Sequence, residues 1–312
     1  MGGSSPRSTG PRMRLLILGA SGFLGQHVSR QAAEAGADVV TAGRAERPDS
    51  PAYRRLDLAA DEPARIAEMI ASVGPDAVLN CAGATTGGPD LLAAVNVTGT
   101  YALVRAMLDA GTPARLVHLG SAAEYGRVEP GVPVAESAPS RPVAAYGATK
   151  LAGTRLVELA RAAGLDAVVL RVFNPVGAGA PENGLPGRLA AELRRALASG
   201  TDVRLGPLDA VRDFVDARDV AAAVLAAAAA PSLPHAVLNV GSGTGVLART
   251  LVKELIAISG YAGPVHEDSP GPARSSDVPW NQADITLARQ DLDWRPRHDL
   301  AASVADLWEG GP

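Results

Sequence analysis

The segment that most limits the possible fold is a glycine-rich turn, GASGFLG, at residues 19–25. A short apolar run, Arg14–Leu18, comes directly before it, and an Ala-rich helical stretch comes directly after it. Glycine lets the backbone turn tightly and approach a pyrophosphate, whose charge then lies against free N–H groups at the helix N-terminus. Because strand, turn and helix agree, the segment predicts a dinucleotide-binding unit.

The rest of the chain continues this alternation of short apolar runs and longer Ala-rich helical stretches, which is typical of a parallel sheet. The fold class is therefore α/β: we predict a Rossmann-like doubly wound parallel sheet with a smaller C-terminal substrate lobe. The predicted strands are Arg14–Leu18, Asp38–Thr41, Ala77–Asn80, Arg115–Leu119, Ala167–Arg171 and Val237–Val240.

The domain boundaries are indicated by changes in composition. Residues 1–12 are rich in Gly, Ser and Pro and are expected to be a disordered lead-in. Residues 13–172 carry the regular alternation and form the dinucleotide-binding domain, completed by a strand near 237–241. A Gly/Pro/Asn-rich loop begins after Phe173, so we expect residues 173–312 to form mainly the substrate lobe.

Composition also limits the class of partner. The formal net charge of −4 over 312 residues is small, and no dense Lys/Arg block is present. We therefore expect a small-molecule substrate, and neither a nucleic acid nor a membrane partner.

The single cysteine, Cys81, excludes an internal disulfide, and the first residues lack an apolar signal segment, so a cytoplasmic location is expected. The apolar stretch Val220–Ala230 is too short to span a bilayer and is predicted to be a buried helix.

Two later segments carry side chains suited to proton transfer. Ser121 ends a predicted strand in LVHLGSAAEYG, and Tyr146 and Lys150 come later in AAYGATK. The i, i+4 spacing puts Tyr146 and Lys150 on one face of a helix. A phenol with a pKa near ~10 needs a neighbouring cation to exchange protons at neutral pH, and Lys150 can supply it. Ser121 can hydrogen-bond a substrate oxygen, so we predict these three as the catalytic set.

The order and spacing of these motifs resemble the extended short-chain dehydrogenase/reductases, in particular the NAD-dependent epimerase/dehydratase family that modifies nucleotide sugars. The resemblance covers nearly the whole chain from Met13 onward. It implies that RLDL contacts the adenine and that NCAG, residues 80–83, borders the cofactor. We interpret Cys81 there as a packing residue, not a nucleophile. The predicted cofactor-binding residues are Gly19, Ser21, Gly22, Phe23, Leu24, Gly25, Arg44, Asp57, Leu58, Cys81, Ala82, Gly83, Tyr146, Lys150 and Phe173.

Arg44 bears on the choice of cofactor. It ends the segment TAGR, where an NAD enzyme usually offers Asp or Glu to the ribose hydroxyls. A cation there suits a 2′-phosphate, so NADP(H) is preferred. NAD(H) is the alternative, in which Glu46 supplies the acid and Arg44 is a solvated loop residue.

The C-terminal half contains segments that resemble the family's substrate-binding motifs. RVFNPVGAG implies that Asn174 neighbours a substrate diphosphate, and two later segments, VRDF and ARSSD, supply Arg212 and Arg274 as a clamp. A guanidinium binds phosphate oxygens bidentately, although salt bridges to Asp213 or Asp277 are the alternative. The predicted substrate-binding residues are Thr85, Ser121, Asn174, Arg188, Arg212 and Arg274, and no metal ligand is predicted.

The two residues after Ser121 narrow the choice of reaction. Dehydratases of this type place an acidic pair at these positions, whereas this chain has Ala122 and Ala123, so dehydration is disfavoured. Glu124 is not assigned that role. We expect NADPH-dependent reduction of a nucleotide-diphosphate 4-keto-deoxysugar, with Tyr146 donating the proton. The alternatives are a nucleotide-sugar 4-epimerase, a reductase of a non-sugar ketone such as a polyketide or aromatic natural product, and a non-catalytic dinucleotide sensor.

The resemblance also implies a homodimer. Its interface would involve the two helices near Leu91–Asp109 and Tyr146–Ala163.

Overall fold

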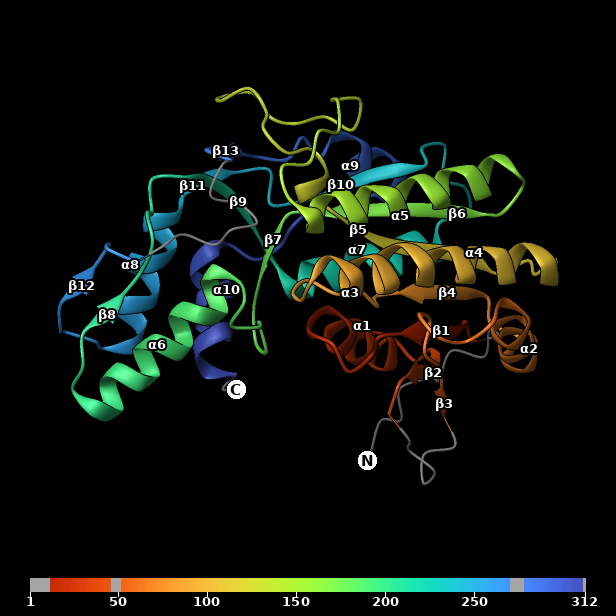
Figure 1. The fold of residues 1–312 in the computed structure, drawn as a ribbon, viewed down its shortest axis with the longest axis horizontal. Coiled ribbons are helices and arrows are strands. Elements are labelled where there is room, and N and C mark those ends of the chain that lie inside the picture. Colours follow the sequence, from red (N-terminus) through yellow and green to blue (C-terminus); the bar gives the residue numbers. More distant parts are fainter. Residues whose placement is uncertain (1–11, 46–51, 270–277, 311–312) are drawn as a thin grey trace, which may run out of the picture.

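The computed structural model describes residues 12–45, 52–269 and 278–310, and within these ranges seven parallel strands form the main sheet (Figure 1). Their order is β10-β6-β5-β4-β1-β2-β3, which confirms the predicted Rossmann-like α/β class. The strands are β1 (Arg14–Leu18), β2 (Asp38–Gly43), β3 (Tyr53–Arg55), β4 (Ala77–Asn80), β5 (Arg115–Ser121), β6 (Ala167–Val172) and β10 (Val237–Val240).

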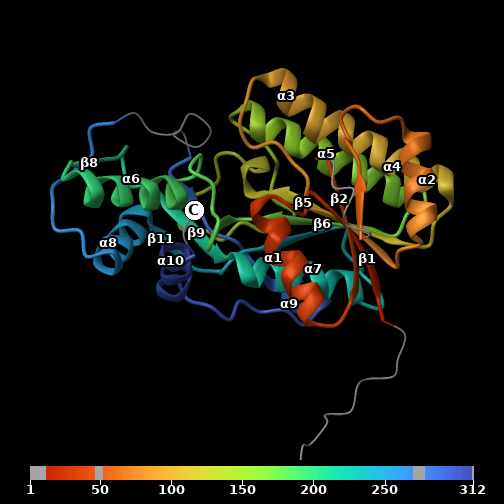
Figure 2. The ribbon, with the colours of Figure 1, turned by 90° about the horizontal axis from the view of Figure 1, so that it is seen from below.

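Helices cover both faces of this sheet (Figure 2). Successive residues of β1 point to opposite faces: Leu15 and Ile17 belong to one buried apolar cluster, and Leu16 and Leu18 to the other. The first cluster lies beneath α1 (Phe23–Glu34) and α7 (Ala217–Ala229), which pack against each other. The second lies beneath α2 (Pro63–Val73), α4 (Gly99–Ala110) and α5 (Ala145–Ala162). Burial on both faces explains the continuous apolar strand sequences.

One long helix lies on the second face. It runs from α3 (Pro89–Ala93) through a π-helical turn, η1 (Ala94–Thr98), into α4. Among the described residues this stretch, Pro89–Ala110, is the one helix long and apolar enough to cross a membrane by length and composition. However, 50% of its apolar window is buried, and α4 packs against α2 and α5. Such burial is typical of a core helix in a layered α/β fold.

The smaller lobe is built around a second sheet, with order β11-β9-β13 and with β7 also paired to β9. Its strand β9 was not predicted, because the sequence VRDFVD mixes charged and apolar residues. The remaining elements are β7 (Asn174–Val176), α6 (Leu185–Ser199), β8 (Val203–Arg204), β9 (Val211–Asp216), β11 (Gly245–Leu247), α8 (Ala248–Ser259), β12 (Val265–His266), β13 (Trp280–Asn281), α9 (Thr286–Leu292) and α10 (Leu300–Glu309).

The order of strands locates a crevice. The chain passes from β1 outward to β2 and β3, and then crosses to β4, β5 and β6 on the other side of β1. The loops after β1 and β4 therefore lead in opposite directions, and ligands of open α/β sheets bind at such a switch point, beyond the carboxyl ends of the strands.

Candidate active site

The glycine-rich turn forms a cradle made of backbone alone. Gly19 has φ +73°, and a Cβ at this position would lie 2.7 Å from the backbone of Ala82. A Cβ at Gly25 would lie 2.1 Å from the Gly19 carbonyl oxygen. Within the described residues, the first turn of α1 has neither a side-chain cap at Gly22 nor an acidic residue. Its N–H groups are thus left for an anion, and the cradle fits the pyrophosphate of a dinucleotide.

The other predicted cofactor residues lie after the carboxyl ends of neighbouring strands. Arg44 is exposed directly after β2, while the alternative residue Glu46 lies outside the described residues. Asp57 is partly buried after β3, and its Oδ1 accepts a hydrogen bond from Ala59 N at 3.1 Å. Leu58 is buried beside Gly99. Around the turn itself, Ser21 and Gly83 are exposed, and the partly buried positions are Phe23, Leu24, Cys81 and Ala82.

Two of the predicted cofactor residues also take part in packing. Phe173 is fully buried at the end of β6, with its ring centroid 6.3 Å from that of Tyr125. Its side chain lies in the apolar cluster against which the partly buried Leu24 and Cys81 also pack. Desolvation raises the pKa of the Cys81 thiol to about 12, although the residue as a whole is only partly buried. A thiol that stays protonated is a poor nucleophile, in keeping with a packing role.

The elements that carry the three predicted catalytic residues meet where α5 packs against β5 and the short turn η2 (Ala122–Glu124). A Cβ at Gly147 would lie 2.4 Å from the Ala123 carbonyl oxygen, so the residue after Tyr146 must be glycine for this close approach. Ser121 caps η2, and its Oγ accepts a hydrogen bond from Ala123 N at 3.2 Å. Since the hydroxyl accepts from that amide, its own proton can be donated to a substrate oxygen.

Lys150 lies in an enclosed position on α5. Its side chain is buried, with the residue only 5% exposed, and Nζ donates a hydrogen bond to the Leu119 carbonyl at 2.5 Å. Burial lowers the pKa of Lys150, while interactions with Glu124 and then Cys81 act in the opposite direction. Tyr146, one helical turn earlier, is partly exposed. The helix thus carries a partly exposed phenol and, one turn later, a buried amine.

Asn96 is a residue of this site that the sequence analysis missed. It lies in η1 and is 3% exposed. Its side chain bonds both the N–H and the carbonyl of Ala84, each at 2.9 Å, and donates to Thr149 Oγ1 at 3.1 Å. It therefore joins the loop after β4 to α5. An asparagine inside an otherwise apolar helix was the available signal, because a buried amide needs partners.

Three of the predicted substrate residues, Asn174, Arg188 and Arg212, lie on elements of the smaller lobe. Asn174 begins β7 and donates through Nδ2 to the Asp213 carbonyl at 2.8 Å, next to Arg212 on β9. Burial lowers the pKa of the Arg212 guanidinium. Arg188 lies in the first turn of α6, where its Nε is buried and has no hydrogen-bond partner among the described residues. Arg274 and Asp277 lie outside the described residues.

Two further contacts complete this side. Thr85, on the loop after β4, accepts a hydrogen bond from Asn183 Nδ2 at 2.8 Å, which bridges the large domain and the lobe. The Asp213 carboxylate accepts hydrogen bonds from the backbone N–H groups of Ser242, Gly243 and Ala283 and from the Ser242 hydroxyl. Asp213 thus organises the loop after β10.

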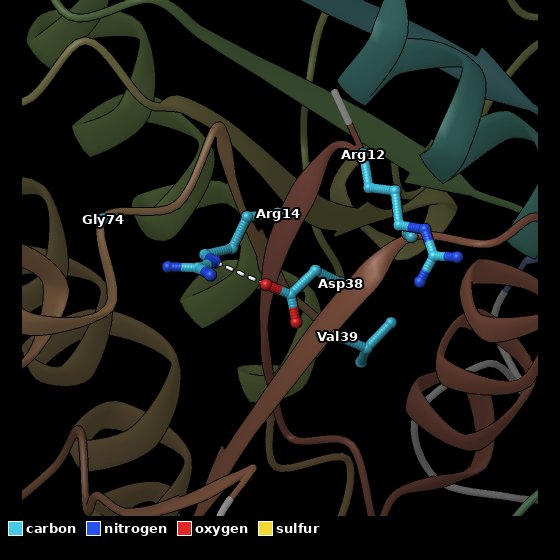
Figure 3. Close-up of a pocket in the computed structure, with 6 residues that line it drawn as sticks. Arg12, Arg14, Asp38, Val39 and Gly74 are labelled. Carbon is cyan, nitrogen blue, oxygen red and sulfur yellow. Dashed lines mark hydrogen bonds and ion pairs between the residues drawn. The ribbon is translucent and has the colours of Figure 1, made fainter. Parts of the chain in front are cut away.

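The amino ends of the strands, opposite the predicted site, carry an open depression. An open depression of about 620 Å³ lies at the amino ends of β1 and β2, lined by Arg12, Arg14, Asp38, Val39 and other residues (Figure 3). None of the predicted site residues lines it. We therefore assign the candidate site to the carboxyl ends of the strands.

Comparison with known proteins agrees with this arrangement. The model of the NAD dependent epimerase/dehydratase family matches residues 15–241. The dTDP-6-deoxy-L-talose 4-dehydrogenase (NAD(P)(+)) of Kitasatospora kifunensis is 40% identical over 302 residues, covering 95% of this chain and 94% of that protein. The UDP-glucose 4-epimerase of Streptomyces lividans is 33% identical over 319 residues, covering 95% of each.

A solved structure, MoeE5 in complex with UDP-glucuronic acid and NAD, has a TM-score of 0.81 and 28% identity, covering 95% of this chain and 98% of that chain. The backbone cradle, the residues on α5 and the family match lead to one conclusion. The chain belongs to the NAD-dependent epimerase/dehydratase family and is an NAD(P)-dependent oxidoreductase of the extended short-chain dehydrogenase/reductase type.

Proposed function

We propose that this enzyme is an NADPH-dependent reductase that acts on a nucleotide-diphosphate 4-keto-deoxysugar. The observation that supports the proposal is the packing of α5 against η2 and β5, the elements that carry Tyr146, Lys150 and Ser121, while Ala122 and Ala123 offer no acid or base for dehydration. The 40% identity with a protein described as a dTDP-6-deoxy-L-talose 4-dehydrogenase supports chemistry at a sugar C4 position.

The residues of the site have distinct tasks in this reaction. A nicotinamide cofactor bound at the cradle supplies the hydride that reduces the keto carbon. Ser121 donates a hydrogen bond to the keto oxygen and holds it in place. Tyr146 donates the proton that this oxygen gains, and the Lys150 ammonium stabilises the phenolate left behind. Asn96 and Gly147 hold α5 at the distance that this requires.

The lobe supplies the groups that recognise the nucleotide diphosphate. Arg212 precedes Asp213, whose carbonyl accepts the hydrogen bond of Asn174, and Arg188 lies in the first turn of α6. Guanidinium groups match phosphate oxygens in both charge and geometry. The preference for NADPH rests on Arg44, which is exposed where a 2′-phosphate would be met.

A second candidate is nucleotide-sugar 4-epimerisation. It is favoured by the 33% identity with a UDP-glucose 4-epimerase across 95% of both chains. An epimerase returns the hydride to its substrate, so it shows no net oxidation of NADPH. Net consumption of the cofactor therefore separates the two functions.

The exposed apolar residues on the second helical face support a homodimer. Leu91 on α3, Tyr101 on α4 and Leu159 on α5 are 48%, 50% and 68% exposed. Burying such side chains between two copies would remove apolar surface from water. We expect Leu159→Glu to convert a dimer into a monomer, as measured by light scattering, and a wild-type monomer would contradict this interface.

The decisive experiment is a titration of the enzyme with NADPH and NADH, followed by addition of a dTDP-linked 4-keto-6-deoxysugar and measurement of the reduced cofactor's absorbance. We expect stoichiometric oxidation of NADPH that Tyr146→Phe slows by roughly 10²–10⁴-fold. The matched control Tyr261→Phe, whose phenol bonds carbonyls of the lobe, should retain activity. Tight cofactor binding without net oxidation would replace this proposal with an epimerase, a reductase of a non-sugar ketone or a sensor.

A further inference from the structure

A buried carboxylate lies directly behind the candidate catalytic serine. Glu124 is 0% exposed, and its Oε1 accepts a hydrogen bond from the backbone N–H of Ser121 at 2.7 Å. The Ser121 hydroxyl in turn accepts from Ala123 N, which closes a reciprocal capping arrangement around η2. The side chain of Glu124 therefore fixes the backbone from which Ser121 reaches the crevice.

Arg171 supplies the counter-charge. Its Nε donates to Glu124 Oε2 at 2.8 Å, and its side chain is 3% exposed. The register of β5 and β6 pairs Gly120 with Arg171, so the arginine emerges beside the turn that holds Glu124. The guanidinium also lies 4.6 Å from the centre of the Tyr125 ring and donates to Ser140 Oγ at 3.2 Å. The arginine is thus held from several sides.

The neighbourhood leaves no room for a different arrangement. A Cβ at Gly120 would lie 2.8 Å from Glu124 Oε1 and 3.2 Å from Arg171 Cγ. The glycine before Ser121 is therefore required by the ion pair. Each oxygen of Glu124 already accepts a hydrogen bond, and neither is exposed to a substrate. The carboxylate is badly placed to replace the acid that a dehydratase would have at positions 122 and 123.

We propose that the buried Glu124–Arg171 pair is a positioning device for catalysis. It fixes the Ser121 backbone, and it supplies a negative charge in the neighbourhood of Lys150, whose Nζ bonds the Leu119 carbonyl two residues before Ser121. The catalytic tasks of Ser121 and Lys150 rest on the proposed function. The placement of the pair rests on the contacts described here, so the two can be tested separately.

Three titratable side chains interact electrostatically with the Lys150 amine, namely those of Glu124, Cys81 and His118. The Cys81 thiol has a pKa raised to about 12, and burial together with Lys150 holds the pKa of His118 well below its usual range. Both are therefore neutral at pH 7. Tyr146 lies one turn earlier on the same helix. Glu124 is the carboxylate among the three, and its charge opposes the lowering of the Lys150 pKa by burial.

The first test does not depend on activity. The chain has two lysines, Lys150 and Lys253, so a protein labelled with ¹³C-lysine gives two side-chain signals, which Lys253→Arg assigns. Glu124→Gln keeps an oxygen acceptor for Ser121 N–H but removes the charge. We expect the NMR titration of Lys150 to move to lower pH in this variant. The matched control Glu192→Gln, which breaks a surface pair on α6, should leave it unchanged. An unmoved Lys150 titration in Glu124→Gln would overturn the electrostatic task.

The second test separates positioning from stability. An apolar replacement of one partner alone removes its hydrogen bonds as well as its charge and can unfold the protein, whereas an apolar pair of similar volume is often tolerated. We expect Glu124→Leu/Arg171→Met to fold and to bind NADPH as the wild type does, but to lose roughly 10–100-fold in kcat because Ser121 is displaced. A folded double variant with wild-type kcat would overturn the positioning task.

The two proposals fail in different ways. If the wild-type enzyme does not turn over the keto sugar, the proposed function fails, but the Lys150 titration still decides the charge relation between Glu124 and Lys150. If turnover is normal and both variants match the wild type, only the positioning device is refuted.

Discussion

The two ends of the strands in the main sheet both carry an arginine–carboxylate pair, but in opposite surroundings. At the amino ends, Arg14 and Asp38 meet at 2.6 Å with side chains 50% and 44% exposed, in the open depression of Figure 3. At the carboxyl ends, Glu124 and Arg171 meet at 2.8 Å with almost no exposure. Water screens the first pair, so it contributes little, while the second has exchanged hydration for fixed protein partners. The two ion pairs have similar N–O distances, but their different burial gives them different effects on stability.

The largest expected effect comes from removing the arginine of each pair. Arg171→Met leaves a buried carboxylate without its counter-charge and should lower the free energy of unfolding by about 3–5 kcal/mol. Arg14→Met removes a screened surface pair and should cost less than about 1 kcal/mol. Urea unfolding of both variants measures the difference. Equal decreases in the free energy of unfolding would show that burial does not make one ion pair more important for stability than the other.

A substitution in the glycine cradle tests whether the cofactor binds at the carboxyl ends of the strands. Gly25→Ala puts a methyl group 2.1 Å from the Gly19 oxygen, so the turn must open. We expect the Kd for NADPH to rise by roughly 10–100-fold, the equivalent of the usual cost of overpacking. Gly88→Ala is the matched control, because its Cβ meets nothing within 4 Å. Isothermal titration of both variants decides, and unchanged binding in Gly25→Ala would place the cofactor elsewhere.

The buried His118, which lies in the sheet between its two ends, makes stability depend on pH. It is 1% exposed in β5, 3.0 Å from Asn80 Nδ2, and burial lowers its pKa well below the usual range. Below about pH 6.5 the unfolded imidazole binds a proton that the folded one does not, so stability falls as pH falls. We expect a loss of about 2 kcal/mol between pH 6.5 and 5 that His118→Gln removes. Urea midpoints at both pH values measure it, and parallel losses in the two proteins would refute the prediction.

The smallest effect concerns the choice of cofactor. Arg44→Ser removes the cation that we assign to the 2′-phosphate and should weaken NADPH binding by roughly tenfold, with NADH binding unchanged. Arg14→Met, at the other ends of the strands, should change neither affinity. An equal decrease for both cofactors in Arg44→Ser would mean that Arg44 does not read the 2′-phosphate.

The sequence predicted those elements whose signal is local. β1, β4 and β10 were predicted at their observed bounds, because each is an apolar run enclosed by turn residues. β3, with the sequence YRR at the sheet edge, carries no apolar run and was not predicted. In β9 the buried Asp213 is satisfied by Ser242 and Ala283, which are distant in sequence. No local sequence pattern could reveal that these distant residues provide the hydrogen bonds that a buried aspartate needs.

The same distinction applies to the site. Ser121, Tyr146 and Lys150 were predicted from motif order, and the structure brings the elements that carry them together. The pair of Glu124 and Arg171 was not predicted, because its members are 47 positions apart and meet only through the register of β5 and β6. Residue types at fixed spacing can indicate chemistry, but the residues that hold them in place become visible only with strand pairing.

The late arrival of β10 has a consequence for synthesis on the ribosome. β6 pairs with β5 on one side and with β10 on the other, and every residue of β6 is buried. Residues 173–236 must be translated before β10 emerges, and α7, which packs against α1, lies within that stretch. Until then the nascent chain has an apolar strand with an open edge, the kind of surface that chaperones and aggregation both exploit. A ribosome that stalls within the lobe would therefore leave a dinucleotide-binding half that cannot close its own sheet.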